Sequence, residues 1–561
     1  MTAMNAAQVP DLIPAAREEE MFPTLTPEQL ERLAAQGQRR SVGAGEVLHE
    51  GSEHVSRFFV LVRGQIEILA GEDFGERVVV LSRPGQFTGE LNVLSGRRGF
   101  VRVRAATDSE VAEVDREHLL SIVQTDDELS GILMRAFILR RVELIARGLG
   151  DVVLIGSTHS AGTLRVQEFL TRNSHPYTYV DLERSPDVQS LLDRFHVTVA
   201  DIPVLICRSD VVLKNPTNAE VAACLGFNEA IDQAQVRDLV IVGAGPSGLA
   251  AAVYGASEGL DVLVVEATSP GGQAGSSSKI ENYLGFPAGV SGQELAGRAY
   301  VQAQKFGAEV LIAKGATQLS CSRKPYAIDL DEGVRVPGRT VIIATGAAYR
   351  KLTVENLAAF EGAGVYYGAT FVESRLCKGE DVIVVGGGNS AGQAAVFLSR
   401  TARHVYMLVR SSGLADSMSR YLIRRIERSP NIELLTQTEI VGLAGDDHLD
   451  QVRWRTRGKD RDETHGVRHV FVMTGAVPAT KWLDGCVALD GGGFIKTGPD
   501  LTPADLEAAR WPLARPPHLL ETSLPGVFAV GDVRRGSMKR VASAVGEGST
   551  AVAFVHQALK E

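Results

Sequence analysis

A glycine-rich turn near the middle of the chain has the residue spacing that holds a dinucleotide pyrophosphate. In DLVIVGAGPSGLAAAVYG, Gly243, Gly245 and Gly248 follow an apolar strand and open a helix. The first glycine permits the tight turn, the second lets a pyrophosphate approach the backbone, and the third lets the helix pack closely on the strand. Glu266 ends the next predicted strand, 266 − 243 = 23 residues after the first glycine, where an acid suits a ribose hydroxyl.

A second turn, in DVIVVGGGNSAGQAAVF, repeats this spacing with a different residue at the acidic position. Gly386, Gly388 and Ala391 take the three small positions. The place equivalent to Glu266 is residue 386 + 23 = 409, a valine, and Arg410 follows it. Because no acid is available for a 2′-hydroxyl and a cation lies beside it, the turn favours a 2′-phosphate. We therefore predict two cofactors, FAD and NADPH rather than NADH.

The cysteines are too far apart for a C-x-x-C redox pair. No two of them lie within three residues of each other, and we interpret each as a small buried hydrophobic side chain. The five are Cys207, Cys224, Cys321, Cys377 and Cys486. We predict no metal site.

The elements that position these residues belong to a long, multidomain chain. With 561 residues, the chain is expected to form roughly three to five domains. A net charge of −10 argues against nucleic acid as a partner. No apolar run reaches the roughly 18 residues of a membrane span, and the first residues lack the pattern of a signal peptide. We therefore expect a cytoplasmic protein.

Residues 22–148 are predicted to form a small antiparallel β-roll after a tail, residues 1–21. In LTPEQLERLAAQG, Thr26 is the expected N-cap of a short helix. Short apolar runs such as RFFVLVRGQIEIL, separated by glycines, are typical of strands and turns. The stretch DDELSGILMRAFILRRVELIARGLG is predicted to close this module as a helix.

The roll resembles the cyclic-nucleotide-binding domain family. The resemblance lies in GEVLHEGS, FVLVRGQIEI and GQFTGELNVLSGRRGFVRVRA. It implies that Gly89, Glu90 and Leu91 form the turn that contacts the cyclic phosphate and the ribose hydroxyl. The family's phosphate-binding Arg falls on Gly99, and the loss of a buried guanidinium–phosphate pair weakens binding.

Two interpretations of this departure stay open. In the first, another arginine replaces the missing one, and the candidates are Arg97, Arg98 and Arg102. In the second, the roll binds no cyclic nucleotide and serves as a regulatory or docking scaffold.

Residues 149–230 resemble the thioredoxin/glutaredoxin family. The predicted order of elements is β-α-β-α-β-β-α, and RVQEFLTRNSHPYTYVDLE and DIPVLIC carry the resemblance. It implies a cis peptide bond at Ile202–Pro203. The family's C-x-x-C falls on the four residues from Ser160 to Thr163. Hydroxyl groups form no disulfide, so we expect no electron transfer at this site.

Residues 236–561 resemble the low-molecular-weight thioredoxin reductase family. Three segments occur in the family's order with the two glycine-rich turns: GGQAGSSSKIENYLGFP, VIIATGA and TSLPGVFAVGDVRRGSMKRVASAVGEG. The resemblance implies two Rossmann-like, three-layer α/β domains in a homodimer. The FAD-binding domain combines residues 236–350 and 495–561, and the NAD(P)H-binding domain, residues 351–494, is inserted between them.

This resemblance assigns residues to each cofactor. The family's H-R-R segment reads Val409, Arg410 and Ser411, so one arginine matches and Arg420 is the candidate for a second. The residues assigned to FAD are Gly243, Gly245, Ser247, Gly248, Glu266, Gly272, Gln273, Asn282, Gly346, Gly531, Asp532, Lys539, Arg540 and Val541. Those assigned to NADPH are Gly386, Gly388, Asn389, Ser390, Ala391, Arg410 and Arg420.

The redox C-x-x-C of this family falls on the segment from Gly368 to Phe371, with Ala369 and Thr370 between them. Hydride transfer from NADPH to a flavin needs no protein thiol, whereas exchange with a disulfide does. We therefore predict an oxidoreductase that reduces an external acceptor directly, such as a quinone, dioxygen or a ferredoxin-like carrier, with the roll as regulator. The alternatives are a thioredoxin-disulfide reductase, as the whole-chain similarity suggests, and a non-catalytic redox sensor.

Overall fold

The computed structural model of the chain divides into two compact units, which are described separately. The first unit contains Met1–Ile155, Ser174–Ile231 and Gln304–Glu309, and the second contains Gly156–Asn173, Asp232–Ala303 and Val310–Glu561. The structure describes residues 18–51, 53–70, 77–146, 152–157, 160–182, 201–207, 211–446, 448–459, 461–483 and 485–561. At residues 70, 77, 146, 371 and 372 it describes the backbone alone.

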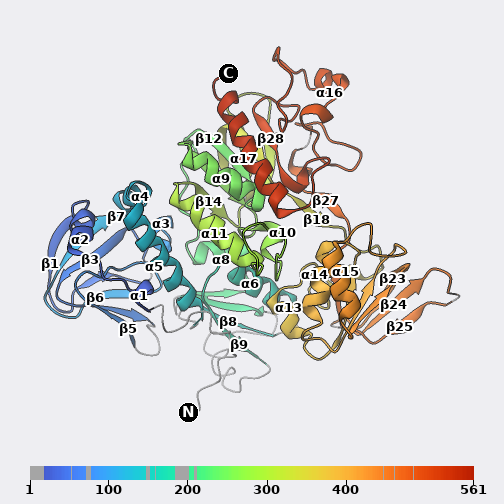
Figure 1. The fold of residues 1–561 in the computed structure, drawn as a ribbon, viewed down its shortest axis with the longest axis horizontal. Coiled ribbons are helices and arrows are strands. Elements are labelled where there is room, and N and C mark those ends of the chain that lie inside the picture. Colours follow the sequence, from blue (N-terminus) through green and yellow to red (C-terminus); the bar gives the residue numbers. More distant parts are fainter. Residues whose placement is uncertain are drawn as a thin grey trace. The chain divides into compact units, whose positions relative to one another are not determined.

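The first unit contains the predicted antiparallel roll, drawn in blue in Figure 1. Its two sheets have the strand orders β1-β7-β3 and β2-β6-β4-β5. The strands are β1 (Gln38–Val42), β2 (Val47–His49), β3 (Arg57–Arg63), β4 (Ile66–Ala70), β5 (Arg77–Ser82), β6 (Arg102–Ala105) and β7 (Ser109–Asp115). The helices are α1 (Glu18–Met21), α2 (Pro27–Ala34), α3 (Asn92–Ser95), α4 (Arg116–Thr125) and α5 (Asp127–Ala146).

The roll is closed by its helices as the sequence predicts. Thr26 is the N-cap of α2, and its hydroxyl accepts a hydrogen bond from the backbone N–H of Gln29. In the core, Phe137 of α5 meets Phe58 and Phe87 edge to face, with ring centroids 6.0 and 6.1 Å apart. The long helix is therefore held on the roll by aromatic packing.

A third sheet follows in the first unit, with the strand order β11-β10-β8-β9. Its elements are β8 (Val152–Gly156), β9 (Thr178–Asp181), β10 (Val204–Cys207), β11 (Val211–Lys214) and the helix α8 (Asn218–Cys224). The described elements occur in the predicted order, and the expected cis bond at Ile202–Pro203 is confirmed. The helix expected between β9 and β10 falls on residues 183–200, outside the described residues. The helix α6 (Ala161–Arg172) belongs to the second unit.

The flavin-domain residues of the second unit form a 7-stranded sheet with the order β14-β13-β12-β17-β16-β15, and β28 pairs with β17. The strands are β12 (Arg237–Val242), β13 (Val262–Glu266), β14 (Glu309–Ile312), β15 (Ala316–Ser320), β16 (Tyr326–Leu330), β17 (Arg335–Ile343) and β28 (Val527–Ala529). The helices are α9 (Pro246–Ser257), α10 (Gly272–Gly275), α11 (Gly292–Lys305), α16 (Pro503–Ala508) and α17 (Val541–Ala558). Helix α17 packs against α9, so the two chain segments predicted for this domain come together (Figure 1).

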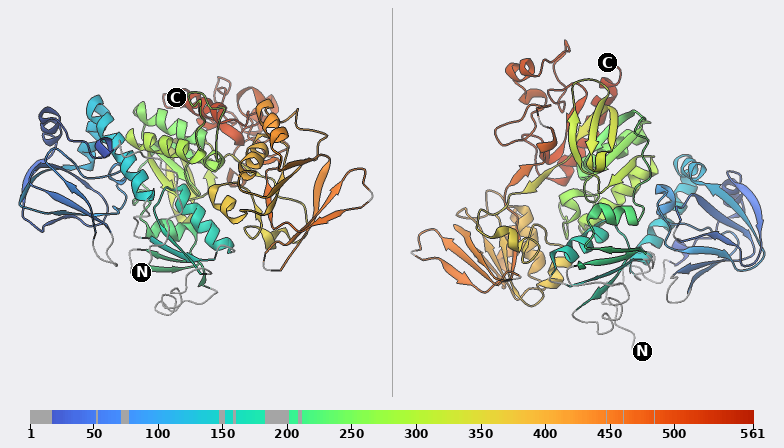
Figure 2. Two further views of the ribbon diagram at one scale, coloured as in Figure 1. Left: turned by 60° about the horizontal axis from the view of Figure 1, so that its bottom comes forward. Right: turned by 180° about the vertical axis from the view of Figure 1, so that it is seen from behind.

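The inserted residues form a parallel sheet with the order β19-β26-β20-β21-β22 and an antiparallel sheet β23-β24-β25. The strands are β19 (Val365–Tyr366), β20 (Asp381–Val385), β21 (His404–Leu408), β22 (Ile432–Leu435), β23 (Thr438–Ala444), β24 (Gln451–Thr456), β25 (Glu463–His465), β26 (His469–Val472) and β27 (Ala476–Pro478), and β18 (Ala347–Tyr349) lies just before the inserted residues. The helices are α12 (Leu357–Phe360), α13 (Phe371–Leu376), α14 (Asn389–Leu398) and α15 (Arg420–Arg428). Strands β18 and β27 pair where the chain enters and leaves this region (Figure 1). The strands of the antiparallel sheet are the orange arrows in Figure 2.

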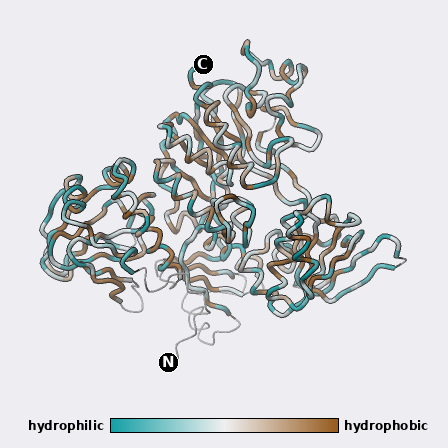
Figure 3. The backbone as a smooth tube through the Cα atoms, viewed as in Figure 1, coloured by the Kyte–Doolittle hydropathy of each residue, from teal (hydrophilic) through white to brown (hydrophobic). Residues whose placement is uncertain are grey.

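Hydrophobic residues are concentrated in the central strands of these sheets, as the brown stretches in Figure 3 show. Strands β12, β13 and β20 are almost entirely buried, which explains their continuous apolar sequences. Within the described residues, no helix is both long and apolar enough to cross a membrane.

Two disulfides correct the interpretation of the cysteines as separate buried side chains. Cys207 of β10 is bonded to Cys224 of α8, with the Cα atoms 6.7 Å apart. Cys321 and Cys486 are bonded with their Cα atoms 5.9 Å apart. The partners are 17 and 165 residues apart in sequence, so a search for neighbouring cysteines does not find them. Cys377 is free and buried, as expected.

Candidate cofactor sites

The first glycine-rich turn, between β12 and α9, has the predicted steric requirements. Gly243 has a positive φ of 106°, and a Cβ atom there would overlap the carbonyl oxygen of Ala344. A Cβ at Gly248 would overlap the carbonyl oxygen of Gly243. At Gly245 no atom lies within 4 Å of such a Cβ. The turn is therefore tight where the chain must bend and open where a pyrophosphate would lie, so these residues fit a bound dinucleotide.

Glu266 lies beside this turn and holds it to the next loop. Its buried carboxylate accepts hydrogen bonds from the backbone N–H groups of Ala244 at 2.7 Å, Thr268 at 2.9 Å and Ser269 at 3.2 Å. The sequence assigned this carboxylate to a ribose hydroxyl. The structure adds a role that the sequence did not indicate, which is to order the backbone around the turn.

The second FAD segment contacts the first turn through Gly531. A Cβ atom at Gly531 would lie 2.6 Å from Ser247 Oγ, and the Gly531 N–H donates a hydrogen bond to Glu547 Oε2 at 2.7 Å. Burial raises the pKa of the neighbouring Asp532, and the positive charge of Lys539 opposes this shift. Glu547 was missed in the sequence because it lies inside a helix, α17, whose N-cap is Arg540 and whose first residue is Val541.

The remaining predicted FAD contacts lie on two loops. A Cβ atom at Gly272 would lie 3.1 Å from the Cα of Gly245, so this loop lies against the first turn. Gln273 Nε2 donates a hydrogen bond to the carbonyl oxygen of Ala347 at 2.5 Å. Gly346 has a φ of 65° and open space beside it, and Asn282 is exposed.

The second glycine-rich turn, between β20 and α14, repeats the geometry of the first. Gly386 has a φ of 139°, and a Cβ atom there would lie 2.5 Å from the carbonyl oxygen of Met473. Gly388 is the N-cap of α14 and has open space beside it, whereas Ala391 is completely buried. This turn therefore also fits a bound dinucleotide.

The loop after β21 folds over this second turn. The Ser419 N–H donates to Asn389 Oδ1 at 2.7 Å, and Ser417 Oγ donates to the carbonyl oxygen of Gly387 at 2.8 Å. Arg410 begins this loop, and Arg420 begins the helix that follows it. Both are exposed, and neither forms an ion pair within the described part of the chain. Two cations therefore flank the loop where the 2′-phosphate of NADPH would bind.

A tyrosine that the sequence did not indicate connects the two cofactor regions. Burial raises the pKa of Tyr349, Ser390 of α14 opposes this shift, and the negative charge of Asp532 adds to it. Ser390 belongs to the predicted NADPH site, and Asp532 belongs to the predicted FAD site.

The segment at the family's redox C-x-x-C position ends at Phe371, the first residue of α13, and Gly368 lies near Ser276 of the predicted flavin loop. The nearest atoms to a Cβ built at Gly368 would be those of Ser276 and Thr370, each 4.0 Å away. The Thr370 N–H donates to Glu373 Oε2 at 2.8 Å at the start of α13, and burial raises the pKa of Glu373. The side chain of Phe371 lies outside the described residues.

The hydroxyls at the other C-x-x-C position act as a helix cap. Ser160 is the N-cap of α6, and its Oγ accepts a hydrogen bond from the Thr163 N–H at 3.3 Å. Thr163 is fully buried.

In the roll, the glutamate expected at the ribose is already paired. Glu90 Oε2 accepts a hydrogen bond from Arg141 Nη1 at 3.1 Å, and Oε1 accepts one from the Asn92 N–H at 3.1 Å. Gly89 has a φ of 90°, and Leu91 is the N-cap of α3. The turn is formed, but its carboxylate is held by an arginine of α5.

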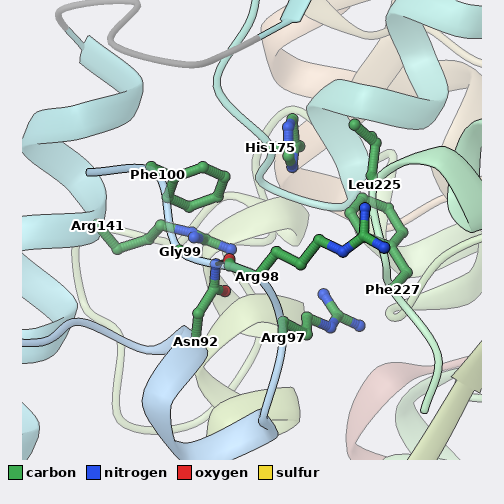
Figure 4. Close-up of a pocket in the computed structure, with 9 residues that line it drawn as sticks. All are labelled: Asn92, Arg97, Arg98, Gly99, Phe100, Arg141, His175, Leu225 and Phe227. Atoms are coloured by element: carbon green, nitrogen blue, oxygen red, sulfur yellow. Dashed lines mark hydrogen bonds between the residues drawn. The ribbon is translucent and has the colours of Figure 1, made fainter. Parts of the chain in front are cut away.

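The three candidate arginines have different surroundings. Arg97 and Arg98 line a pocket that also includes Gly99, shown in Figure 4. The Arg97 guanidinium carbon lies 4.8 Å from the ring centroid of Phe227, and Arg98 donates to the carbonyl oxygen of Cys224. Arg102 pairs with Glu50 at 2.6 Å. A Cβ atom at Gly99 would lie 2.5 Å from His49 Nε2, so the place of the family's arginine is occupied by a histidine ring.

The described residues contain no group of three or more His, Cys, Asp or Glu side chains that could hold a metal ion.

Comparison with known proteins supports the division of the chain into a roll and a region with two dinucleotide turns. The family model described as "Pyridine nucleotide-disulphide oxidoreductase" matches residues 237–548, and the model described as "Cyclic nucleotide-binding domain" matches residues 39–126. Thioredoxin reductase from Mycolicibacterium smegmatis is 34% identical over 317 residues, which are 56% of this chain and 94% of that protein. Thioredoxin reductase from Mycoplasmopsis pulmonis is 29% identical over 332 residues, 59% of this chain and 100% of that protein.

Solved structures give the same result. The crystal structure of T. acidophilum thioredoxin reductase covers 58% of this chain and 99% of its own, with 28% identity and a TM-score of 0.51. That of Lactococcus lactis thioredoxin reductase in the FR conformation covers the same shares, with 25% identity and a TM-score of 0.51. The chain therefore belongs to the pyridine nucleotide-disulphide oxidoreductase family, as a thioredoxin reductase-like, FAD-dependent NAD(P)H oxidoreductase with an N-terminal cyclic nucleotide-binding domain.

Proposed function

We propose that the chain transfers a hydride from NADPH to FAD and that the reduced flavin passes its electrons directly to an external acceptor, without a protein disulfide. The observation that carries this proposal is the segment from Gly368 to Phe371, which opens α13 beside the flavin loop and contains no thiol. A mixed disulfide with thioredoxin cannot form at these residues. The proposal includes the predicted domain boundaries and a thioredoxin-like module without a redox function.

The space around Gly368 supports direct access to the cofactor. Because nothing lies within 4.0 Å of a Cβ at this position except Ser276 and Thr370 at that limit, the missing side chain has not been replaced by another one from the described residues. We infer that a flat acceptor such as a quinone approaches the flavin on this side.

The preference for NADPH rests on Arg410, Arg420 and Val409. Both arginines are exposed at the ends of the loop over the second turn, and the buried valine stands where an acid would bind the 2′-hydroxyl of NADH.

A second candidate function, thioredoxin-disulfide reduction, is favoured by the similarity to thioredoxin reductases and by the disulfide between Cys321 and Cys486. This pair lies in the same unit as the flavin domain, and it offers two sulfurs that the C-x-x-C position lacks. Exchange of Cys321 for Ser separates the two candidates, because only disulfide reduction needs this pair.

Anaerobic reduction of the FAD-loaded protein by NADPH, followed by flavin absorbance, tests the proposal. We expect NADPH to bleach the flavin and menadione to reoxidise it within the same mixing experiment. Thioredoxin with the Ellman disulfide is expected to give negligible turnover, and Cys321→Ser to leave menadione reduction unchanged. Thioredoxin turnover of about 1 s⁻¹ or more would establish the second candidate. A flavin that NADPH does not reduce would instead establish a non-catalytic sensor.

Gly368→Ala is the matched control for access to the flavin. The added Cβ has room, so we expect NADPH reduction of the flavin to be unchanged. Gly368→Trp fills the same space and should slow menadione reduction alone. Equal effects on both half-reactions would show that this space is not the route of the acceptor.

A further inference from the structure

The roll contains a half-open cavity of about 90 Å³ whose walls are mostly apolar. The apolar side chains around it come from both sheets, from α5 and from the residues at the end of α1. They include Phe22, Phe59, Ile68, Val80, Val103 and Leu144. Gly89 and Glu90 also line it, so this cavity lies at the turn that defines the cyclic-nucleotide-binding family.

The polar groups that would recognise a cyclic nucleotide are not free in this cavity. Glu90 is paired with Arg141, and the position of the phosphate-binding arginine is Gly99. His49 borders the cavity at that place, and its Nε2 has no hydrogen-bond partner among the described residues. A ribose would lose its hydration without gaining a bond to Glu90, which disfavours its binding.

A different cation, Arg140 of α5, reaches the same turn from the other side. Its Nη1 donates to the carbonyl oxygen of Gly89 at 2.7 Å, and its Nε donates to that of Met21 at 2.9 Å. Its guanidinium carbon lies 4.7 Å from the ring centroid of Phe87 and 5.1 Å from that of Phe22. The side chain is therefore held in one orientation at the wall of the cavity.

Part of this guanidinium has no partner. Arg140 is 6% exposed, and its Nη2 is buried without a hydrogen-bond acceptor in the described part of the chain. Its two hydrogen bonds end on carbonyl oxygens, and it forms no ion pair with a described residue. Glu143, one turn along α5, also borders the cavity and has an interaction of its own.

The two buried arginines at the turn differ in their partners. Arg140 and Arg141 are 6% and 7% exposed, and Glu90 is 8% exposed. Arg141 pairs with Glu90, whereas the hydrogen bonds of Arg140 end on carbonyl oxygens. A buried cation without an ion pair is destabilised, so an anion beside Arg140 would stabilise this site. Burial lowers the pKa of Arg140 to about 9, so this cation is still charged at neutral pH.

We propose that the roll binds a small carboxylic acid with an apolar body, whose carboxylate pairs with Arg140 and whose body fills the cavity between the sheets. The Nη2 group supplies the free donor, and a guanidinium–carboxylate pair is among the strongest hydrogen-bonded contacts in proteins. The apolar walls favour an aryl or alkyl body over a ribose or a second phosphate. This inference goes beyond the proposed electron transfer and does not depend on it.

Isothermal titration of the full chain, loaded with FAD, tests the charge requirement directly. The probes are 4-phenylbutyrate and its neutral analogue 4-phenyl-1-butanol, which have the same body and differ in the carboxylate. We expect the acid to bind at least tenfold more tightly than the alcohol, and cyclic AMP and cyclic GMP to bind more weakly than the acid. Equal binding of acid and alcohol, tighter binding of a cyclic nucleotide, or no binding of the acid would overturn the proposal.

Substitutions at Arg140 locate the site. Arg140→Leu should remove the tenfold preference for the acid and retain binding of the alcohol, whereas Arg140→Lys should keep part of the preference. Arg63→Leu is the matched control, because Arg63 is an exposed arginine at the end of β3 that does not line the cavity. If Arg140→Leu still binds the acid more tightly than the alcohol, the carboxylate does not pair with Arg140. If this variant does not fold, the acid and alcohol titrations of the unsubstituted protein and of Arg140→Lys still test whether the carboxylate pairs with Arg140.

Discussion

The two dinucleotide turns of the second unit have the same backbone geometry and differ in the side chains that surround it. In each, the first glycine has a positive φ and lies against a carbonyl oxygen, and the second has open space beside it. At the third position, Gly248 has no room for a Cβ, whereas Ala391 carries one. At the end of the following strand, Glu266 is replaced by Val409 and Arg410.

This difference indicates that the glycine positions serve to bind a pyrophosphate, whereas the strand-end residues serve to select the nucleotide. In the proposed function, the first two glycines would serve the part that FAD and NADPH share, and both turns have them. The strand-end residue would meet the ribose, where the two nucleotides differ by a phosphate, so a buried carboxylate in one turn and an exposed cation in the other are expected. Substitutions should therefore have effects of different size, with the largest at the third glycine of the first turn, where a Cβ has no room.

Gly248→Ala should abolish retention of FAD. The new Cβ would overlap the carbonyl oxygen of Gly243, and because this atom belongs to the backbone, α9 must move away from the turn. Overpacking of this kind costs about 1–3 kcal/mol or more. We expect a colourless protein with a lowered melting temperature, measured by flavin absorbance and by thermal unfolding. Gly245→Ala is the control, since its Cβ has open space, and it should perturb the fold less. A yellow Gly248→Ala protein of unchanged melting temperature would show that α9 is not packed this closely.

Glu266→Gln should weaken FAD binding by about 10- to 100-fold. The carboxylate uses both oxygens as acceptors, Oε2 for Ala244 and Oε1 for Thr268 and Ser269. An amide has one acceptor oxygen, so its NH₂ group must face a backbone N–H on one side. An unsatisfied buried donor costs about 1–3 kcal/mol. Equilibrium dialysis of FAD measures the effect, with Glu258→Gln, an exposed change just after α9, as the control. Unchanged affinity would mean that the turn keeps its shape without the carboxylate.

The two turns also show what the sequence could and could not predict. The strand–turn–helix order and the three small positions were predictable because glycine spacing is local and sterically demanding. The hydrogen bonds of Glu266 with Thr268 and Ser269, and of Ser419 with Asn389, could not be predicted. They join loop residues, and loops have no repeating sequence pattern from which such contacts could be inferred.

The same limit explains the errors in the rest of the chain. The disulfides join cysteines from different elements, and the partner of Glu90 lies on α5, 51 residues away. Counting along the motif shows that Gly99 stands at the position of the family's arginine. The sequence does not show that the ring of His49, from β2, lies against this position. Long-range pairing depends on the packed fold, whereas motif spacing does not.

Arg410→Ala should narrow the preference for NADPH over NADH. A hydrogen bond to a charged group contributes about 1.5–3 kcal/mol, and exposure of Arg410 places the effect at the lower end, about tenfold in kcat/KM. Flavin reduction rates with both nucleotides measure it. The rate with NADH should not change, because NADH lacks the 2′-phosphate. Arg400→Ala, an exposed arginine after the C-terminal end of α14, is the control. A parallel loss with both nucleotides would assign Arg410 to the pyrophosphate, and no loss would assign the preference to Arg420.

Ala391→Gly should have the smallest effect, and it tests the third position from the opposite side. This substitution gives the second turn the residue of the first. The Ala391 Cβ lies 3.2 Å from the place that a Cβ would take at Gly386, and it is fully buried, so its removal leaves a small gap. Glycine inside a helix costs about 1 kcal/mol relative to alanine. We expect a small decrease in melting temperature and less than a threefold change in the KM for NADPH, because the backbone of the turn is retained. A tenfold or greater loss of NADPH affinity would mean that this methyl group, absent from the first turn, positions α14 for the nucleotide. The two turns would then differ in how they hold the pyrophosphate as well as in how they select the ribose.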